Sequence, residues 1–352
     1  LNQILRPVSE RTLTKFVLKR LGVGLIQIVS LMVLVFFLIR LLPADPVARF
    51  VGLNASAEAY AQAEISLGLD KPVLEQFKIY LLGDEQADGL IHGSLGNSWI
   101  SGSPVLYHIG LTLPATLELI LLSFLISVSL AIPIGVAGAT SPNGAVNKGT
   151  LIYGLFAGSQ PEFSWGTIFI FLFFVILDVA PGPLGRISPL TEPPDPVTGM
   201  IVVDSLIAGR PDLLLESLWY LSLPVLTLSF VLTGPIIKMV RENVSQSMSL
   251  GFIQYGEAVG LSKKMLASDS LLAAVAPTLT LIGILFSFML GGAVLIESMF
   301  SINGLGQFSL QSVLAMDYPA IQGVVIVISS LTLLVYLLLD VTQALLDPRL
   351  RA

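Results

Sequence analysis

Residues 113–138, with the sequence LPATLELILLSFLISVSLAIPIGVAG, can be expected to cross a lipid bilayer. The run holds a single charged residue, Glu118, and no charged side chain occurs between Leu119 and Asn147. A helix needs about 20 mostly apolar residues to span the ~30 Å hydrocarbon core of a membrane. The run meets this requirement, so it predicts a transmembrane helix.

The rest of the chain has a similar character. Only 12% of its 352 residues are charged, about half the ~25% of a typical soluble domain, and 54% are hydrophobic. This composition argues against a soluble enzyme, a disordered chain and a DNA-binding domain. We therefore predict an all-α, polytopic membrane protein with about six transmembrane helices, at residues 16–40, 113–138, 151–178, 217–238, 272–297 and 320–341.

The first span could instead be a secretory signal peptide, since basic residues between positions 11 and 20 precede it. However, the uncharged run from Leu21 to Ile39 is longer than the ~7–15 residues of a signal peptide. Residues 41–45, LLPAD, also lack the small-x-small pattern of a cleavage site. We therefore interpret this stretch as a transmembrane helix.

The Lys and Arg residues predict which side of the membrane each loop occupies, because cytoplasmic loops carry an excess of them. If the N-terminus is cytoplasmic, only six of the 18 Lys and Arg residues lie outside, namely Arg40, Arg49, Lys71, Lys78, Arg186 and Arg210. This bias predicts that both termini are cytoplasmic.

The predicted topology divides the chain into five segments. They are a cytoplasmic N-terminal tail at 1–15, the first span at 16–40, an outer loop with short helices at 41–112, a core of five spans at 113–342, and a cytoplasmic C-terminal tail at 343–352. The core includes a cytoplasmic loop at 239–271, whose polar helical sequence suggests a docking surface.

The usual motifs for covalent chemistry, metal binding and nucleotide binding are missing from the sequence. It has no Cys, no G-x-S-x-G elbow, and no Gly-Lys pair from which a phosphate-binding P-loop could be built. His92 and His108 have no partners at metal-ligand spacing. We therefore predict no catalytic residue, no metal site, no cofactor and no nucleic-acid partner.

Three acidic residues, Glu118, Glu162 and Glu297, lie in or at the ends of predicted spans. Ionisable groups are rare there and usually face a cavity or a partner. Glu118 and Glu297 are near the outer ends, where a carboxylate can simply reach water. Glu162 follows Gln160-Pro161, roughly 17 Å from the cytoplasmic end of its span, so it is the strongest candidate for a functional carboxylate.

Several short motifs, in order along nearly the whole chain, resemble those of the membrane permease subunit of bacterial ABC importers of the dipeptide/oligopeptide/nickel class. The matching segments are LGLDKP (67–72), GSLGNS (93–98), LPATLEL (113–119), LPVLTL (223–228), ESMF (297–300), GLG (304–306), DYP (317–319) and DPR (347–349). Each motif is weak alone, but their shared order and spacing make the resemblance strong.

The resemblance also assigns a role to the cytoplasmic loop. Residues 254–260, QYGEAVG, align with the E-A-A-x-x-x-G motif that such permeases present to an ATPase, although Gln254 and Gly256 depart from it. The residues implied in ATPase coupling are Lys238, Arg241, Gln254, Gly256, Glu257, Ala258, Gly260 and Lys263. Gly256 and Gly260 lie four residues apart and so share a helix face for close approach; alternatively, Gly260 ends the helix as a C-cap.

The resemblance implies a type I ABC importer permease fold in the bacterial cytoplasmic (inner) membrane. The implied partners are a paralogous permease subunit, two ATPase subunits, a periplasmic substrate-binding protein and the lipid bilayer. The two permeases would enclose a path for peptides or a similar small solute. Candidates for lining this path are Glu162, Gln160, Glu118 and Glu297.

Two other classes of protein compete with this interpretation. A secondary transporter or channel would need no ATPase, and it often shows inverted repeats or broken helices, neither of which is evident in the sequence. An intramembrane enzyme would need a Ser–His or Asp–Asp constellation inside the spans, yet both histidines lie in the first outer loop. The importer permease accounts for more of the motifs than either.

Overall fold

The computed structural model describes residues 10–346, except for residues 53 and 85–87. Within these residues every regular element is helical, which confirms the predicted all-α fold. The predicted tails lie largely outside the described part, because residues 1–9 and 347–352 are not in it. The first described helix begins at Glu10 and the last ends at Leu346, whereas the stretches apolar enough to cross a membrane are Val17–Leu41 and Tyr318–Ala344, so the tails stay a prediction.

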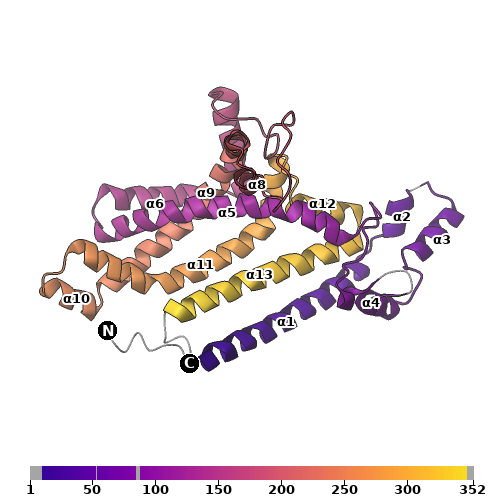
Figure 1. Cartoon of the computed structure of the whole chain (residues 1–352), viewed down its shortest axis with the longest axis horizontal. Coiled ribbons are helices and arrows are strands. Elements are labelled where there is room, and N and C mark those ends of the chain that lie inside the picture. The colour runs from indigo at the N-terminus through magenta and orange to yellow at the C-terminus, as the bar shows by residue number, and fades with distance from the viewer. Residues whose placement is uncertain (1–9, 53, 85–87, 347–352) are drawn as a thin grey trace.

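Five helices are long and apolar enough to cross a membrane. They are α1 (Glu10–Leu41), α5 (Val105–Thr140), α9 (Pro211–Met248), α11 (Lys263–Met299) and α13 (Tyr318–Leu346). Figure 1 shows α1, α5, α11 and α13 running along the longest axis of the molecule. Five of the six predicted spans therefore correspond to continuous helices.

The remaining predicted span, residues 151–178, is not one helix. It consists of α6 (Ala145–Ala157), α7 (Glu162–Phe169) and the π-helix η2 (Ile170–Ile176), and the two arms are bent by 100°. Pro161 explains the break, because it has no N–H to donate and it disfavours a helical conformation at the preceding residue. The chain has six spans only if this bent pair is counted as one broken span.

The packing of α1 against α13 supports that count. Nε of Arg20 lies 3.1 Å from Oδ2 of Asp340, so the start of α1 meets the end of α13. At the other end, the Arg40 guanidinium carbon lies 5.6 Å from the centroid of the Tyr318 ring. The helices are therefore antiparallel, and the first and last described helices open and close on the same side of the bundle. This requires an even number of crossings, as six spans provide.

The first outer loop contains α2 (Pro46–Val51), α3 (Ala57–Ser66), α4 (Val73–Leu82) and the 3₁₀ turn η1 (Leu90–His92). The short helices predicted for the loop at 41–112 are thus present. Asp317, just before α13, ties this loop down: Ser98 Oγ donates to its Oδ2 at 2.5 Å and Trp99 N to its Oδ1 at 3.2 Å.

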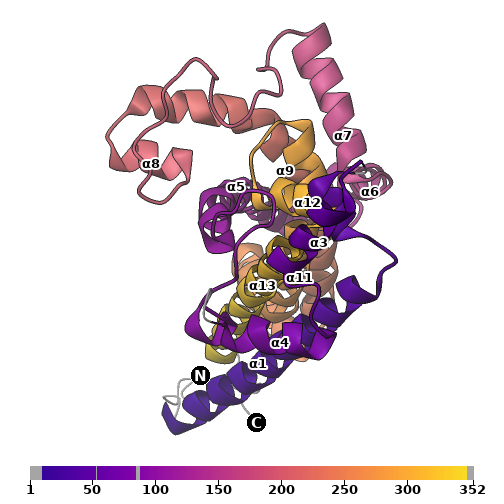
Figure 2. The same cartoon turned by 90° about the vertical axis from the view of Figure 1, so that its right-hand side faces the viewer.

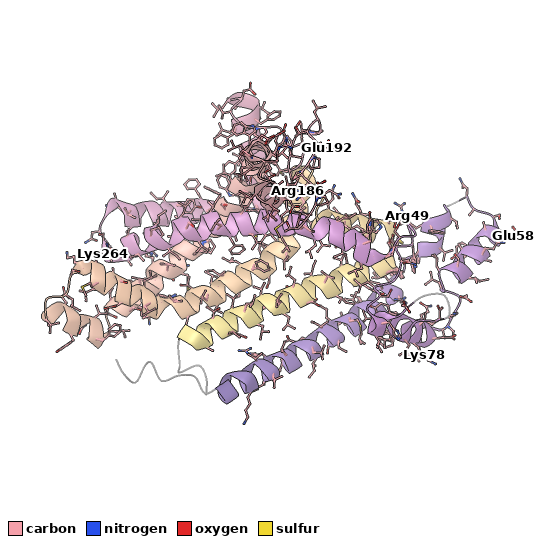
Figure 3. All side chains as sticks on the ribbon, viewed as in Figure 1. Arg49, Glu58, Lys78, Arg186, Glu192 and Lys264 are labelled. Carbon is pink, nitrogen blue, oxygen red and sulfur yellow. The ribbon has the colours of Figure 1, made fainter. Side chains whose placement is uncertain are left out.

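Three shorter helices lie between the later spans. They are α8 (Ile201–Ile207) and α12 (Leu305–Ala315) in the predicted outer loops and α10 (Gly251–Ala258) in the predicted cytoplasmic loop. Figure 2 shows that α7 and α8 project away from the bundle. In Figure 3 the labelled charged side chains lie at the two ends of the bundle and in this projection.

Small and hydroxylated residues hold the central helices together. Ser127 Oγ donates to the carbonyl O of Ser229, and Ser229 Oγ donates to that of Ser123, both at 3.2 Å, so α5 and α9 are bonded in both directions. A Cβ on Gly135 would lie 2.8 Å from Val240, which shows how closely the backbones approach. These contacts are typical of helix packing in membranes, where small residues and interhelical hydrogen bonds replace the hydrophobic effect.

Candidate functional site

Helix α10 lies at the end of the bundle where α1 begins and α13 ends (Figure 1). Its inner side is formed by Ile253 and Gly256, which are buried. Its outer side presents Phe252, Tyr255 and Val259, whose exposed fractions are 53%, 70% and 57%. The spacing i, i+3, i+7 places these three on one side of the helix, and we call them the apolar face of α10.

The two glycines of this loop have structural roles. Gly260 has φ +84°, its N–H donates to the Glu257 carbonyl, and the N–H of Leu261 donates to that of Gly256, both at 3.0 Å. This bond pair is a Schellman cap. A Cβ on Gly256 would lie 2.9 Å from Leu266 and 3.0 Å from Leu261. The structure therefore favours the C-cap alternative and contradicts a shared glycine face open to a partner.

The other residues implied in coupling divide into exposed and bonded ones. Gln254, Glu257, Ala258, Lys263 and Lys238 are exposed. Arg241 is half-buried instead: its Nη1 donates to Oδ1 of Asn147 at 3.2 Å, and its Nη2 lies 3.7 Å from Glu242 Oε1. Arg241 therefore fastens α9 to the start of α6. The coupling role of all these residues stays a prediction.

A hollow of about 460 Å³ lies between α6 and α9, and Lys238 and Arg241 stand among its lining residues. Gly154, Gly158 and Gly234 form part of its wall. The missing side chains leave this space, which runs from the basic pair to the break between α6 and α7.

Glu118 is buried and engaged in a network that joins α5 to the second outer loop. Arg186 Nη1 lies 2.8 Å from Glu118 Oε2 and also donates to the Gly199 carbonyl at 3.1 Å. The N–H of Val202, in α8, donates to Glu118 Oε1 at 2.6 Å. Asp204 holds the same loop, since it accepts from Thr198 and Gly199. Glu118 thus anchors the projecting loop.

Glu297 has an equivalent role in the last outer loop. It is 0% exposed, accepts from Thr116 Oγ1, and accepts at 2.8 Å from the N–H of Gln307 in the first turn of α12. Thr116 Oγ1 in turn accepts from Leu305 N at 2.8 Å. A Cβ on Gly304 would lie 2.3 Å from the Glu297 carboxyl carbon. The absence of a side chain at Gly304 therefore leaves room for the Glu297 carboxylate to accept from the first turn of α12. The burial of Glu118 and Glu297 argues against the prediction that they line a translocation path.

Glu162 differs from both, and its surroundings suit the predicted path. It opens α7 directly after the break, is only partly buried, and rests on α11, where its Oε1 would lie 2.9 Å from a Cβ on Gly292. Among the described residues no Lys, Arg or His forms an ion pair with it. Gln160, two residues earlier, is exposed. Of the four path candidates, these two lie together at the break.

Comparison with known proteins agrees with this arrangement. The family model described as "Binding-protein-dependent transport system inner membrane component" matches residues 131–352, which include the last four predicted spans and the α10 loop. The model "Binding-prot-dependent transport system membrane comp, N-term" matches residues 13–120. The chain belongs to the binding-protein-dependent permease family. The resemblance to ABC importer permeases seen in the sequence is thereby confirmed.

Individual permeases match this one over nearly their whole length. It is 33% identical over 329 residues to the "Probable D,D-dipeptide transport system permease protein DdpB" of Escherichia coli (strain K12), covering 93% of this chain and 95% of that protein. It is 30% identical over 341 residues to the "Dipeptide transport system permease protein DppB" of the same strain, with 96% and 98% covered. It is 32% identical over 339 residues to the "Di/tripeptide transport system permease protein DppB" of Pseudomonas aeruginosa (strain UCBPP-PA14), with 96% and 98% covered.

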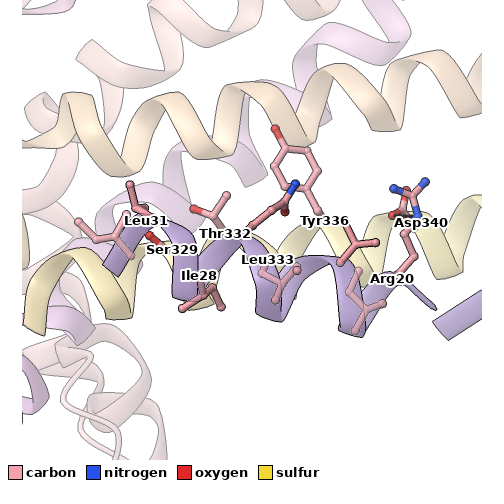
Figure 4. A pocket seen from close by; sticks show the side chains of 13 residues that line it. Arg20, Ile28, Leu31, Ser329, Thr332, Leu333, Tyr336 and Asp340 are labelled. Atoms are coloured by element: carbon pink, nitrogen blue, oxygen red, sulfur yellow. Dashed lines mark ion pairs between the residues drawn. The ribbon is translucent and has the colours of Figure 1, made fainter. Parts of the chain in front are cut away.

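One further hollow of the permease lies between α1 and α13 and has a volume of about 460 Å³ (Figure 4). The Arg20–Asp340 ion pair closes one end of it, and Ser329, Thr332 and Tyr336 give it polar groups within the spans. A Cβ on Gly24 would lie 2.1 Å from Leu333, so the two helices touch at that point. The hollow therefore flanks a close contact between α1 and α13.

Sequence reasoning missed two sets of residues in this permease. Phe252 and Tyr255 could have been found from their i, i+3 spacing, which places them on one side of a helix. They were missed because only the polar motif on the same helix was considered. Arg186 and Val202 gave no local signal as partners of Glu118, because they lie 68 and 84 residues away in the chain.

Proposed function

We propose that this permease is one of two transmembrane subunits of an ATP-driven importer. With a paralogous subunit it encloses the path for a solute that a periplasmic binding protein delivers. Separate ATPase subunits hydrolyse ATP, and this chain converts their closure into alternating access. Its work is a shift of a conformational equilibrium, since each partner binds the two states with different affinity.

The observation that carries this proposal is the apolar face of α10. Phe252, Tyr255 and Val259 are exposed at the end of the bundle that the Lys and Arg distribution predicts to be cytoplasmic. An exposed cluster of aromatic side chains on a short helix is typical of a protein interface, in which aromatic residues are enriched. We therefore assign this face to an ATPase groove of largely apolar character, with Gln254, Glu257 and Lys263 at its rim.

The solute we propose is a short peptide. The three relatives named above are described as transport permeases for D,D-dipeptides, dipeptides and di- or tripeptides. The matches cover 93–96% of this chain and 95–98% of those proteins. The path would run beside the break between α6 and α7, with Glu162 and Gln160 at its wall.

A transporter or channel that is not driven by ATP is the second candidate, and the broken span favours it. Discontinuous helices at membrane depth are common in secondary transporters, where they form the substrate site. Such a protein would have no use for the exposed aromatic side chains of α10. The importer accounts for both features.

Copurification and reconstitution test the proposed function. Purified in mild detergent from its source, the permease should bring a paralogous permease and ATPase chains with it, and vesicles containing this complex should take up a dipeptide only with ATP inside. The permease alone should hydrolyse no ATP, because it has no phosphate-binding loop. Steady ATP hydrolysis by the isolated chain, or dipeptide uptake at the same rate with and without ATP, would refute the proposal.

A further inference from the structure

The break between α6 and α7 exposes non-helical backbone at a depth that corresponds to the hydrocarbon core of the membrane. Helix α6 has 13 residues, which rise about 20 Å at 1.5 Å each, so the break falls inside a hydrocarbon core ~30 Å thick. Residues 158–161 connect the arms outside both helices. The N–H groups of Gly158 and Ser159 still donate to the carbonyls of Gly154 and Phe156, but all four connecting residues are exposed in the isolated chain. Non-helical backbone at this depth must be covered by protein or lie in a water-filled cavity.

Glu162 adds a carboxylate to this break. A carboxylate facing lipid near the bilayer centre is strongly disfavoured, and no cationic side chain of the described residues pairs with it. Its place in the first turn of α7 favours a negative charge there, since helix N-termini are electropositive. The helix therefore supports the charge, but nothing in the described chain neutralises it.

A glycine on the facing helix determines where this carboxylate lies. Gly292 of α11 has no side chain, and Oε1 of Glu162 occupies the space that a Cβ there would need, at 2.9 Å. Neighbouring Gly291 is exposed, and a Cβ there would meet nothing within 4 Å, so α11 has open space next to Gly292. The glycine pair leaves room for a small group to approach Glu162 closely.

We propose that Glu162, positioned by Gly292, binds the ammonium group of the solute as it passes the break. The permease would thereby select solutes with a free amino terminus. This inference rests on the proposed function and adds the chemical group that the path recognises. A carboxylate with free acceptor capacity in a site of low dielectric is suited to an ammonium, since hydrogen bonds between charged groups are about twice as strong as neutral ones.

The test uses the complete complex in vesicles, with two probes: alanyl-alanine and its N-acetylated form, which has no ammonium group. Uptake of each probe and ATP hydrolysis are measured in the same vesicles. A loss of coupling lowers uptake per ATP for both probes alike, whereas a loss of the ammonium site lowers it for alanyl-alanine alone. In Glu162→Gln, uptake of alanyl-alanine per ATP should fall about tenfold or more, because a charged hydrogen bond becomes a neutral one. Uptake of the acetylated probe should not fall.

Two further variants separate position from charge. Glu162→Asp keeps the charge and should recover part of the uptake. Gly292→Ala also keeps the charge but moves the flexible carboxylate aside, so it should lower alanyl-alanine uptake to an intermediate level. Glu75→Gln removes a carboxylate that is exposed on α4 and should match the wild type.

Wild-type uptake per ATP in Glu162→Gln, or an equal fall for both probes, would overturn the inference and leave the permease function standing. If no variant carries the acetylated probe, uptake of alanyl-alanine per ATP decides alone. If the wild-type complex carries neither probe, the proposed peptide function itself is refuted.

Discussion

Replacing Arg186 with Met should release the projecting loop from the bundle. Arg186 Nη1 is the cationic partner of Glu118, at 2.8 Å, and it also bonds the Gly199 carbonyl at 3.1 Å. Met preserves much of the volume of the arginine stem. The carboxylate of Glu118, whose side chain is 2% exposed, would then stay buried without its cation and keep only the N–H of Val202.

The size of the effect follows from this burial. Removing one partner of a buried ion pair costs about 3–5 kcal/mol, because the other charge remains desolvated. The Arg186 side chain is 17% exposed, so water can partly replace it, and we expect a loss of about 3 kcal/mol. Glu118→Gln should cost only about 1–2 kcal/mol, since the amide oxygen still accepts from Val202. The double variant should cost less than the sum of the two.

The assay is a double-mutant cycle on the purified protein in mild detergent, read by thermal unfolding and by hydrogen exchange of the Val202 amide. Arg49→Met, which changes an exposed arginine of the first outer loop, is the matched control and should be silent. Additive effects of Arg186→Met and Glu118→Gln, or unchanged exchange at Val202, would show that this pair does not hold the loop.

Three other predictions follow from single contacts. Gly260→Leu should cost about 1–2 kcal/mol of local stability and reduce coupling, measured as transport per ATP, because φ +84° disfavours a side chain, whereas Gly260→Asn should be nearly neutral. The control is Gly251→Leu, because position 251 has open space and no positive φ. Tyr255→Ser should weaken ATPase binding about tenfold in a pull-down with membrane insertion intact, while Tyr107→Ser, at a predicted outer position where the tyrosine is 59% exposed, should not. Burial alone would raise the pKa of Asp204, but the hydrogen bonds from Thr198 and Gly199 outweigh burial and lower the pKa below its usual value of 3.8. The amides of α8 should therefore be protected from hydrogen exchange above pH 3.8 and lose this protection as the pH falls below that value, and Asp204→Asn should remove the pH dependence. Protection that does not change with acid would contradict this reasoning.

The membrane class and the number of apolar stretches could be predicted from residues alone, and the Lys and Arg residues add a prediction of the side of each loop. Hydropathy and charge act locally: a run such as 113–138 is apolar wherever it lies, and Lys and Arg are sorted across the membrane by their own position in the chain. The predicted short helices of the first outer loop were also correct, since their caps, such as Ser56, are local signals.

The fate of each polar residue in the spans required the packed structure. In the sequence, Glu118, Glu162 and Glu297 all look like isolated carboxylates in apolar surroundings. In the structure, Glu118 is paired with Arg186, whereas no ion pair with Glu162 forms among the described residues. The partners that distinguish them, Arg186 for Glu118 and Thr116 for Glu297, lie 68 and 181 residues away, where no local pattern can indicate them.

The break at Pro161 shows the same division between local and tertiary information. Proline and glycine made an interruption near residues 158–161 foreseeable, but the local sequence does not specify a turn of 100° between the arms. That angle depends on where the arms pack. Tyr153 of α6 donates to the carbonyl of Phe230, and the ring of Trp165 in α7 packs at a tilt against the Phe230 ring with the centroids 4.6 Å apart, so one residue of α9 holds both arms. Hydropathy therefore identified the residues that enter the membrane, whereas contacts between distant helices determined which of their carboxylates are buried and bonded, as Glu118 and Glu297 are.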